Sequence, residues 1–195
     1  MEIRSYTDIA SPKISEGRMI EGFAAVFDQE SRLNFDQKTK RFFIEVIERG
    51  AITDELIQSC DIRALIEHNA QRMIARSRYG TGSLSLMVND YGLGYKLSAP
   101  NTPDGDYAVE MISRGDLYGS SFAYSTDDKK NVTYKKLDGL LYRIVHKIDR
   151  ISDISIVSNP AYYGTDVTLR SLEEIDSSLT DNYYKEQINN LRKFI

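Results

Sequence analysis

Short segments with the pattern of β-strands recur along almost the whole chain, and this recurrence most constrains what it can fold into. Each candidate alternates apolar and polar residues, or is a short apolar run, and turn residues bound it. The candidates are residues 2–8, 18–27, 41–47, 62–66, 72–78, 82–88, 94–99, 117–125, 132–135, 140–147 and 151–157, with a polar loop expected at 29–40. The pattern predicts a mainly β (β-rich α+β) fold, most simply a single closed or partly closed β-barrel.

Two segments interrupt the strands with helical spacing. Ile52, Leu56 and Ile57 are spaced for a short helix that begins after residues 50–51. The apolar residues of 104–114 also fall on one helical face, and Gly115 follows as a C-terminal cap. Because so few helices separate so many strands, we expect them to flank the barrel, and an open α/β sheet is disfavoured.

The composition fits one globular domain with a short extension. The chain has 195 residues, of which 41% are hydrophobic and 28% charged. A chain of this size buries enough surface to fold without disulfides or structural metals. We expect the barrel domain over residues 1–170. In residues 171–195 the apolar positions are sparse, so we expect a flexible or weakly helical C-terminal tail.

Charge and cysteine content disfavour several classes of partner. The net charge is −4 and no segment is dense in Lys and Arg, so no nucleic-acid partner is expected. The N-terminus lacks the apolar core of a secretory signal, and no run reaches the roughly 20 apolar residues of a membrane helix. We therefore expect no membrane association and a reducing compartment. Cys60 is the single cysteine, which excludes an intramolecular disulfide, and we expect it to be buried.

Three polar residues lie in or beside strand candidates, where chemistry can be built. His68 follows an apolar strand, and its imidazole can accept a proton near neutral pH. Ser121 lies two residues after Gly119, and a serine hydroxyl becomes nucleophilic only when a base takes its proton. Asp153, in a strand rich in Ile and Val, could orient the imidazole. Together they predict a serine hydrolase.

Each of these residues also has a purely structural interpretation. His68 could cap a strand at the surface, Ser121 is one of many strand serines, and Asp153 fits an exposed strand position. His146, the other histidine of the chain, shares the alternation of its strand's apolar residues and could simply pack there. It is also the alternative to Asp153 as the third catalytic residue.

The sequence gives little support for a metal or cofactor site. The two histidines stand far apart without an HExxH motif or a cysteine pair. Residues 80–82, Gly-Thr-Gly, lack the Gly-Lys-Ser/Thr that completes a phosphate loop. Asp104 and Asp106 lack the twelve-residue pattern of a calcium loop. We expect no metal and no cofactor.

Five segments, in order along the chain, resemble the motifs of the HK97-type phage prohead (capsid maturation) serine proteases. They are residues 43–51, 64–69, 82–93, 114–122 and 151–162. The chain departs from the family pattern in five places. Arg49 and Ile52 stand where the family usually has Pro and Phe. Glu67 and Asn69 flank His68 where the family has Asn and Asp, and Asp153 stands where it usually has Glu. The resemblance covers roughly residues 2–170.

The resemblance implies a fold like that of the herpesvirus assemblin proteases and the activity of a serine endopeptidase. By position it makes Ser121 the nucleophile, His68 the base and Asp153 the third member. The herpesvirus relatives use a second histidine there, so His146 stays open as the alternative. The implied substrate is scaffold, or the scaffold-like segment of the major capsid protein, cleaved during prohead maturation with self-processing of the protease.

The resemblance also implies a homodimer that works in the host cytoplasm, inside the phage prohead, and that a phage or a prophage encodes. A non-catalytic capsid-assembly or scaffold-binding protein with the same barrel is the main alternative. An esterase is disfavoured, because residues 119–122 do not form the Gly-x-Ser-x-Gly elbow of the α/β-hydrolases.

Overall fold

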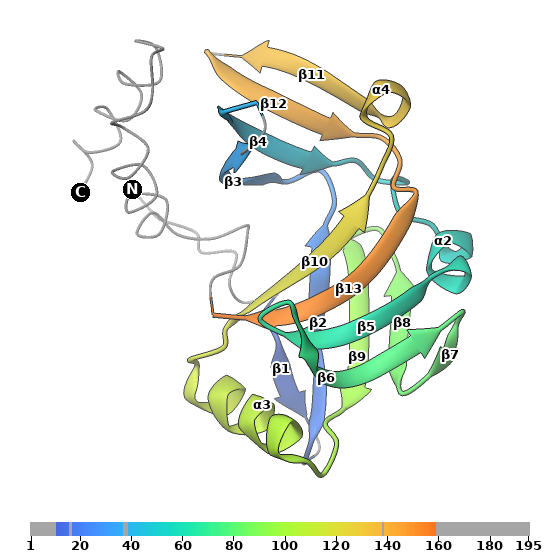
Figure 1. Cartoon of the computed structure of the whole chain (residues 1–195), viewed down its shortest axis with the longest axis vertical. Coiled ribbons are helices and arrows are strands. Elements are labelled where there is room, and N and C mark those ends of the chain that lie inside the picture. Colours follow the sequence, from blue (N-terminus) through green and yellow to red (C-terminus); the bar gives the residue numbers. More distant parts are fainter. Residues whose placement is uncertain (1–10, 16, 37–38, 138, 159–195) are drawn as a thin grey trace, which may run out of the picture.

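The computed structural model describes residues 11–15, 17–36, 39–137 and 139–158. The strands are β1 (Lys13–Ser15), β2 (Met19–Val26), β3 (Glu30–Asp36), β4 (Arg41–Ile47), β5 (Asp61–Ile66), β6 (Asn69–Arg78), β7 (Thr81–Gly82), β8 (Leu84–Val88), β9 (Gly92–Ser98), β10 (Gly119–Ser125), β11 (Val132–Leu137), β12 (Leu140–Val145) and β13 (Arg150–Val157). The helices are α2 (Asp54–Ser59), α3 (Pro103–Arg114) and α4 (Asp128–Asn131). The β-rich class expected from the sequence is confirmed (Figure 1).

The strands form three open sheets, and the first two enclose the hydrophobic core (Figure 1). The first sheet has the order β1-β2-β9-β8 and the second β10-β13-β5-β6-β7. Their inner faces contribute fully buried aliphatic side chains, including Ile20, Leu93, Ile62 and Ile66. Burying each such side chain contributes about 1.5–3 kcal/mol, so this double layer fixes the second sheet as a rigid support.

Closure into a barrel, expected from the strand pattern, is not confirmed. Among the described residues, β10 lies against β2 and β6 against β8 without a ladder joining the two sheets. Side chains bridge the seam instead: the hydroxyls of Tyr95 on β9 and Ser120 on β10 lie 2.8 Å apart. Alternation of apolar and polar residues requires one buried face per strand, and stacked open sheets satisfy it as well as a barrel does.

The third sheet, with the order β11-β12-β4-β3, projects from this double layer (Figure 1). Its central pair, β12 and β4, is parallel. Arg143 on β12 ties it to the second sheet: its guanidinium donates to Glu45 Oε2 at 2.5 Å, to Tyr124 Oη on β10 at 2.6 Å and to Asp128 Oδ1 at 2.6 Å. The third sheet is thus connected directly to the strand that carries Ser121.

Both predicted helices are present, with the capping chemistry that their sequences indicate. The Thr53 hydroxyl accepts from the Leu56 N–H at the start of α2. In α3, the Thr102 hydroxyl accepts from the Gly105 N–H, and Pro103 occupies the first turn. Gly115 ends α3 in the left-handed conformation with φ 79°, as predicted.

The expected loop at residues 29–40 is wrong, since it contains β3. This strand carries few apolar residues, so the sequence signal is weak. Leu33 pairs with Ile44 and Phe35 with Phe42, whose ring centroids lie 5.0 Å apart. As an edge strand it needs apolar contact on one side only, which a polar sequence can supply.

Two predictions concern residues that lie outside the described ones: the strand at 2–8 and the tail at 171–195. The short helix α4 lies in the connection between β10 and β11. Within the described part of the chain, no helix has the length and apolar character needed to span a membrane.

Candidate active site

His68 lies in a two-residue turn between β5 and β6. Ile66 pairs with Asn69 across the turn, and Glu67 and His68 both have positive φ, at 53° and 51°. Two-residue hairpin loops require this left-handed backbone, which costs about 1–2 kcal/mol for a residue other than glycine. The Glu67 side chain offsets part of this cost, because its Oε1 accepts from the Ser158 N–H at 2.7 Å. The turn therefore presents the imidazole in a fixed position.

Ser121 lies in β10, the edge strand of the second sheet, and is 7% exposed. It pairs with Ser155 on β13, so both side chains project from the outer face of the sheet. Asp153, two residues before Ser155, projects from the same face. Ser120 points to the opposite face, where its hydroxyl meets Tyr95 in the core. Strand alternation thus places only one of the two adjacent serines beside the imidazole.

His68 connects Ser121 to Asp153. Its Nδ1 lies 2.7 Å from Asp153 Oδ1, and its Nε2 lies 3.0 Å from Ser121 Oγ. An ionised carboxylate can only accept, so Nδ1 carries the proton and Nε2 is left to accept the serine hydroxyl proton. This is the geometry of a base beside a potential nucleophile, with a third group that orients the base.

Hydrogen bonds keep Asp153 ionised in spite of its burial. Its side chain is 13% exposed, and this burial acts to raise its pKa. Hydrogen bonds from the His68 ring and the Ser155 hydroxyl, the latter 2.9 Å from Oδ1, outweigh burial, and the pKa of Asp153 is lowered overall. At neutral pH the carboxylate is therefore charged and able to stabilise a protonated imidazole.

The comparison with known families decides the family. The sequence pattern of the caudovirus prohead serine protease matches residues 6–178. This chain belongs to that family. A search of curated proteins gives no significant match. The resemblance inferred from five short motifs is therefore confirmed at the level of the family, and the match includes the segments that carry His68, Ser121 and Asp153.

His146, the alternative third residue of this prohead protease family member, lies in a different hydrogen-bonded cluster. Its Nδ1 is 2.7 Å from Glu48 Oε2, and its Nε2 is 2.6 Å from Thr133 Oγ1. Both ring nitrogens are thus occupied by residues of the third sheet or its flanks. The structure brings Asp153 to His68, and it directs the polar atoms of His146 elsewhere.

Two residues that support the site were not assigned a role from the sequence. Ser155 donates to Asp153, and Glu67 fixes the turn that carries His68. The signal for Ser155 was available, because residues two apart on a strand project from the same face. The contact of Glu67 with Ser158 joins residues far apart in the chain, so no local pattern reports it.

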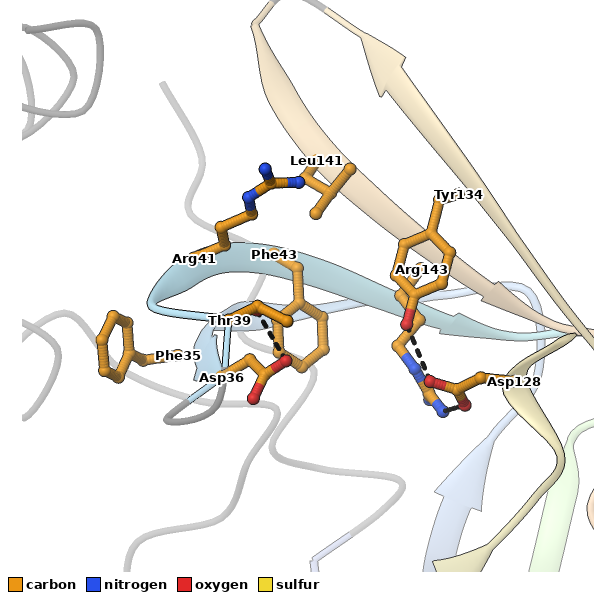
Figure 2. Close-up of a pocket in the computed structure, with 9 residues that line it drawn as sticks. All are labelled: Phe35, Asp36, Thr39, Arg41, Phe43, Asp128, Tyr134, Leu141 and Arg143. Carbon is orange, nitrogen blue, oxygen red and sulfur yellow. Dashed lines mark hydrogen bonds and ion pairs between the residues drawn. The ribbon is translucent and has the colours of Figure 1, made fainter. Parts of the chain in front are cut away.

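The third sheet of this family member carries a separate cavity of about 520 Å³ (Figure 2). Its lining residues are Phe35, Asp36, Thr39, Arg41, Phe43, Asp128, Tyr134, Leu141 and Arg143. Asp36 accepts from Thr39 at one side, and Asp128 binds Arg143 and Tyr134 at the other (Figure 2). The cavity contains no residue of the His68 cluster. Among the described residues, no three His, Cys, Asp or Glu side chains gather in a way that would hold a metal ion.

Proposed function

We propose that this chain is a serine endopeptidase in which Ser121 is the nucleophile, His68 the general base and Asp153 the residue that orients it. One observation carries the proposal: a single imidazole lies 3.0 Å from a buried serine hydroxyl and 2.7 Å from an ionised carboxylate. The carboxylate of this cluster is largely shielded from water: the Asp153 side chain is 13% exposed, whereas Glu48, which contacts His146, is 45% exposed. Membership of a serine protease family supports the same activity.

The reaction uses one ring nitrogen of His68, Nε2, for every proton transfer, while Nδ1 keeps its proton and its hydrogen bond with Asp153. Nε2 takes the Ser121 proton while Oγ attacks the scissile carbonyl carbon. The protonated ring then donates that proton to the leaving amine as the C–N bond breaks, and an acyl ester remains on Ser121. A water molecule, deprotonated by His68, attacks the ester, and the proton returns to Ser121 Oγ. Asp153 stabilises the charged ring throughout.

The substrate that we propose is scaffold, or the scaffold-like segment of the major capsid protein. Family membership supports a capsid maturation protease, and cleavage would take place inside the prohead in the host cytoplasm. We also propose that the protease processes itself and forms a homodimer. Comparing the C-terminal masses of wild type and Ser121→Ala tests self-processing, since identical C-termini in both would exclude it.

Co-expression with the capsid precursor tests the activity directly. Intact mass spectrometry should find a shortened precursor with wild type and an intact precursor with Ser121→Ala. Ser125→Ala is the matched control, because Ser125 is an exposed serine at the other end of β10. Normal cleavage by Ser121→Ala would contradict the assignment. A wild-type protein that binds the precursor without cleaving it, and that does not react with a fluorophosphonate, would support the non-catalytic alternative.

A further inference from the structure

Three arginines project from the sheet face that carries Ser121, immediately beside Asp153. Arg63 on β5 lies directly opposite Arg76 on β6, and Arg78 lies opposite Asp61. Residues that pair in a ladder project from the same face, and Arg63 is also the ladder partner of Asp153. We call Arg63, Arg76 and Arg78 the arginine strip. The strands that carry it, β5 and β6, are neighbours in the second sheet (Figure 1). Ile62 and Ala64, which flank Arg63 on β5, project from the opposite face into the core.

The arginine strip is electrostatically unfavourable by itself. Like charges directly opposite each other on a sheet destabilise it, and Arg63 opposite Arg76 is such a pair. Two carboxylates of the described residues lie at the strip. Asp61 binds the Arg76 guanidinium through both of its oxygens. Asp153, the ladder partner of Arg63, is engaged by His68 and Ser155. Arg63 and Arg78 are exposed, and neither lies within ion-pair distance of a carboxylate among the described residues.

The pKa of Asp61 reflects the arginines around it. Its hydrogen bond with Arg76 is the main reason that its pKa is lowered. Burial has the next largest effect and acts to raise the pKa, and the charges of Arg76, Arg63 and Arg78 each lower it by less. Three guanidinium groups thus face the two carboxylates of Asp61 and Asp153, and the strip keeps a net positive charge that an anionic partner would neutralise.

The arginine strip is within reach of a peptide bound at Ser121. Arg63 lies two strands across and two residues along from Ser121, which corresponds to a Cα separation of about 12 Å. An extended peptide covers that distance in about three to four residues. We propose that the arginine strip binds acidic side chains of the substrate a few residues from the scissile bond. This inference rests on the proposed function, because it assigns the strip to a substrate of the same site.

Charge arguments favour an acidic peptide over nucleic acid. Stable binding to a duplex commonly uses about six to ten phosphate contacts, whereas the strip offers three arginines interrupted by Asp61. The chain as a whole carries a net charge of −4, which repels a polyanion. Guanidinium groups bind carboxylates through two parallel hydrogen bonds, so two or three acidic side chains match the strip.

Peptide binding to Ser121→Ala protein tests the strip without requiring catalysis. The probes are a glutamate-rich peptide and its twin with every Glu replaced by Gln, each carrying a neutral fluorophore and read by fluorescence anisotropy. We expect Arg63→Gln/Arg78→Gln to weaken binding of the acidic peptide about tenfold at low salt, and less at physiological salt. The Gln peptide should be insensitive to the substitution. Lys129→Gln/Lys135→Gln, which removes two exposed cations elsewhere, is the control for net charge.

Three results would overturn the inference: equal binding of the two peptides, equal loss in the control variant, or preferential binding of single-stranded DNA that competes with the peptide at the strip. Fluorophosphonate labelling of Arg63→Gln/Arg78→Gln with Ser121 intact separates the two proposals. Labelling at the wild-type rate with weakened peptide binding supports the strip as a substrate site. Absence of labelling in the wild type would count against the proposed function, and the anisotropy result would still decide the strip.

Discussion

Two clusters in this molecule join a hydroxyl, an imidazole and a carboxylate by hydrogen bonds, and they differ in their surroundings. In the first, His68 joins Ser121 to Asp153. In the second, His146 joins Thr133 to Glu48 with distances just as short. Hydrogen-bond distance alone therefore does not distinguish a candidate catalytic site from a surface cluster.

The two clusters differ in the burial of the carboxylate and in the further hydrogen bonds that hold it. The Asp153 side chain is 13% exposed and receives a further hydrogen bond from Ser155, whereas the Glu48 side chain is 45% exposed. An electrostatic interaction is stronger where water is excluded and the partners cannot move. We infer that a fixed and desolvated carboxylate, on a rigid sheet, makes the His68 cluster suitable for catalysis.

Substituting each histidine by alanine should give the largest difference in cleavage rate between the two clusters. His68→Ala removes the proposed base, and we expect the rate of precursor cleavage to fall about 10³-fold or more. His146→Ala should leave the rate within about twofold of wild type, since its partners face away from Ser121. Single-turnover cleavage measures both. The double variant Ser121→Ala/His68→Ala should be no slower than Ser121→Ala, because residues that act as a unit are not additive.

Substituting the carboxylate of each cluster by its amide should give the next largest difference in cleavage rate. Asp153→Asn removes the charge that stabilises the protonated ring and favours the wrong tautomer, so a loss of about 10³- to 10⁴-fold is expected. Glu48→Gln should change the rate little. Comparable losses of cleavage rate in the two variants would mean that the His146 cluster also supports the reaction. The distinction drawn between the two clusters would then be wrong.

A smaller effect should follow from Ser155→Ala. The substitution removes one hydrogen bond to Asp153 and leaves the His68 contact in place. We expect the rate to fall about tenfold, in line with one hydrogen bond to a charged group. The limiting rate should fall while KM stays constant, since Ser155 acts through Asp153. Ser155→Thr, which keeps the hydroxyl, should restore part of the rate.

The smallest effect concerns stability at acid pH. The folded pKa of Asp153 lies below the reference value of 3.8, so its ionised form stabilises the fold above that pH. This contribution is lost as the pH falls through the folded pKa. Urea unfolding of wild type and Asp153→Asn, from about pH 6 to about pH 3, should therefore show a stability difference that shrinks on acidification. A difference that grows on acidification would contradict the direction of the shift.

Much of the site could be predicted from the sequence, because its parts are local. The strand pattern around Ser121 and Asp153 gives two outward-facing polar positions, and His68 ends an apolar strand. The face on which Ser121 lies follows from the register of β10 against β13, which alternation along one strand cannot supply. The choice between Asp153 and His146 required knowing which strands are neighbours.

The arrangement of the sheets was less predictable, for a physical reason. A strand reports through its sequence that one face is buried, and not which sheet buries it. The open sheets and the polar strand β3 therefore had no clear signal. The arginine strip was also invisible, since Arg63 and Arg76 become neighbours only through the β5–β6 ladder.

Fluorophosphonate labelling followed by peptide mapping tests the central claim most directly, because only an activated hydroxyl reacts. The wild type, Ser121→Ala and Thr133→Ala would be compared in one experiment. The account predicts a single adduct on Ser121, absent from Ser121→Ala and unchanged in Thr133→Ala. An adduct on Thr133 or Ser120, or equal labelling of Ser121→Ala, would contradict it.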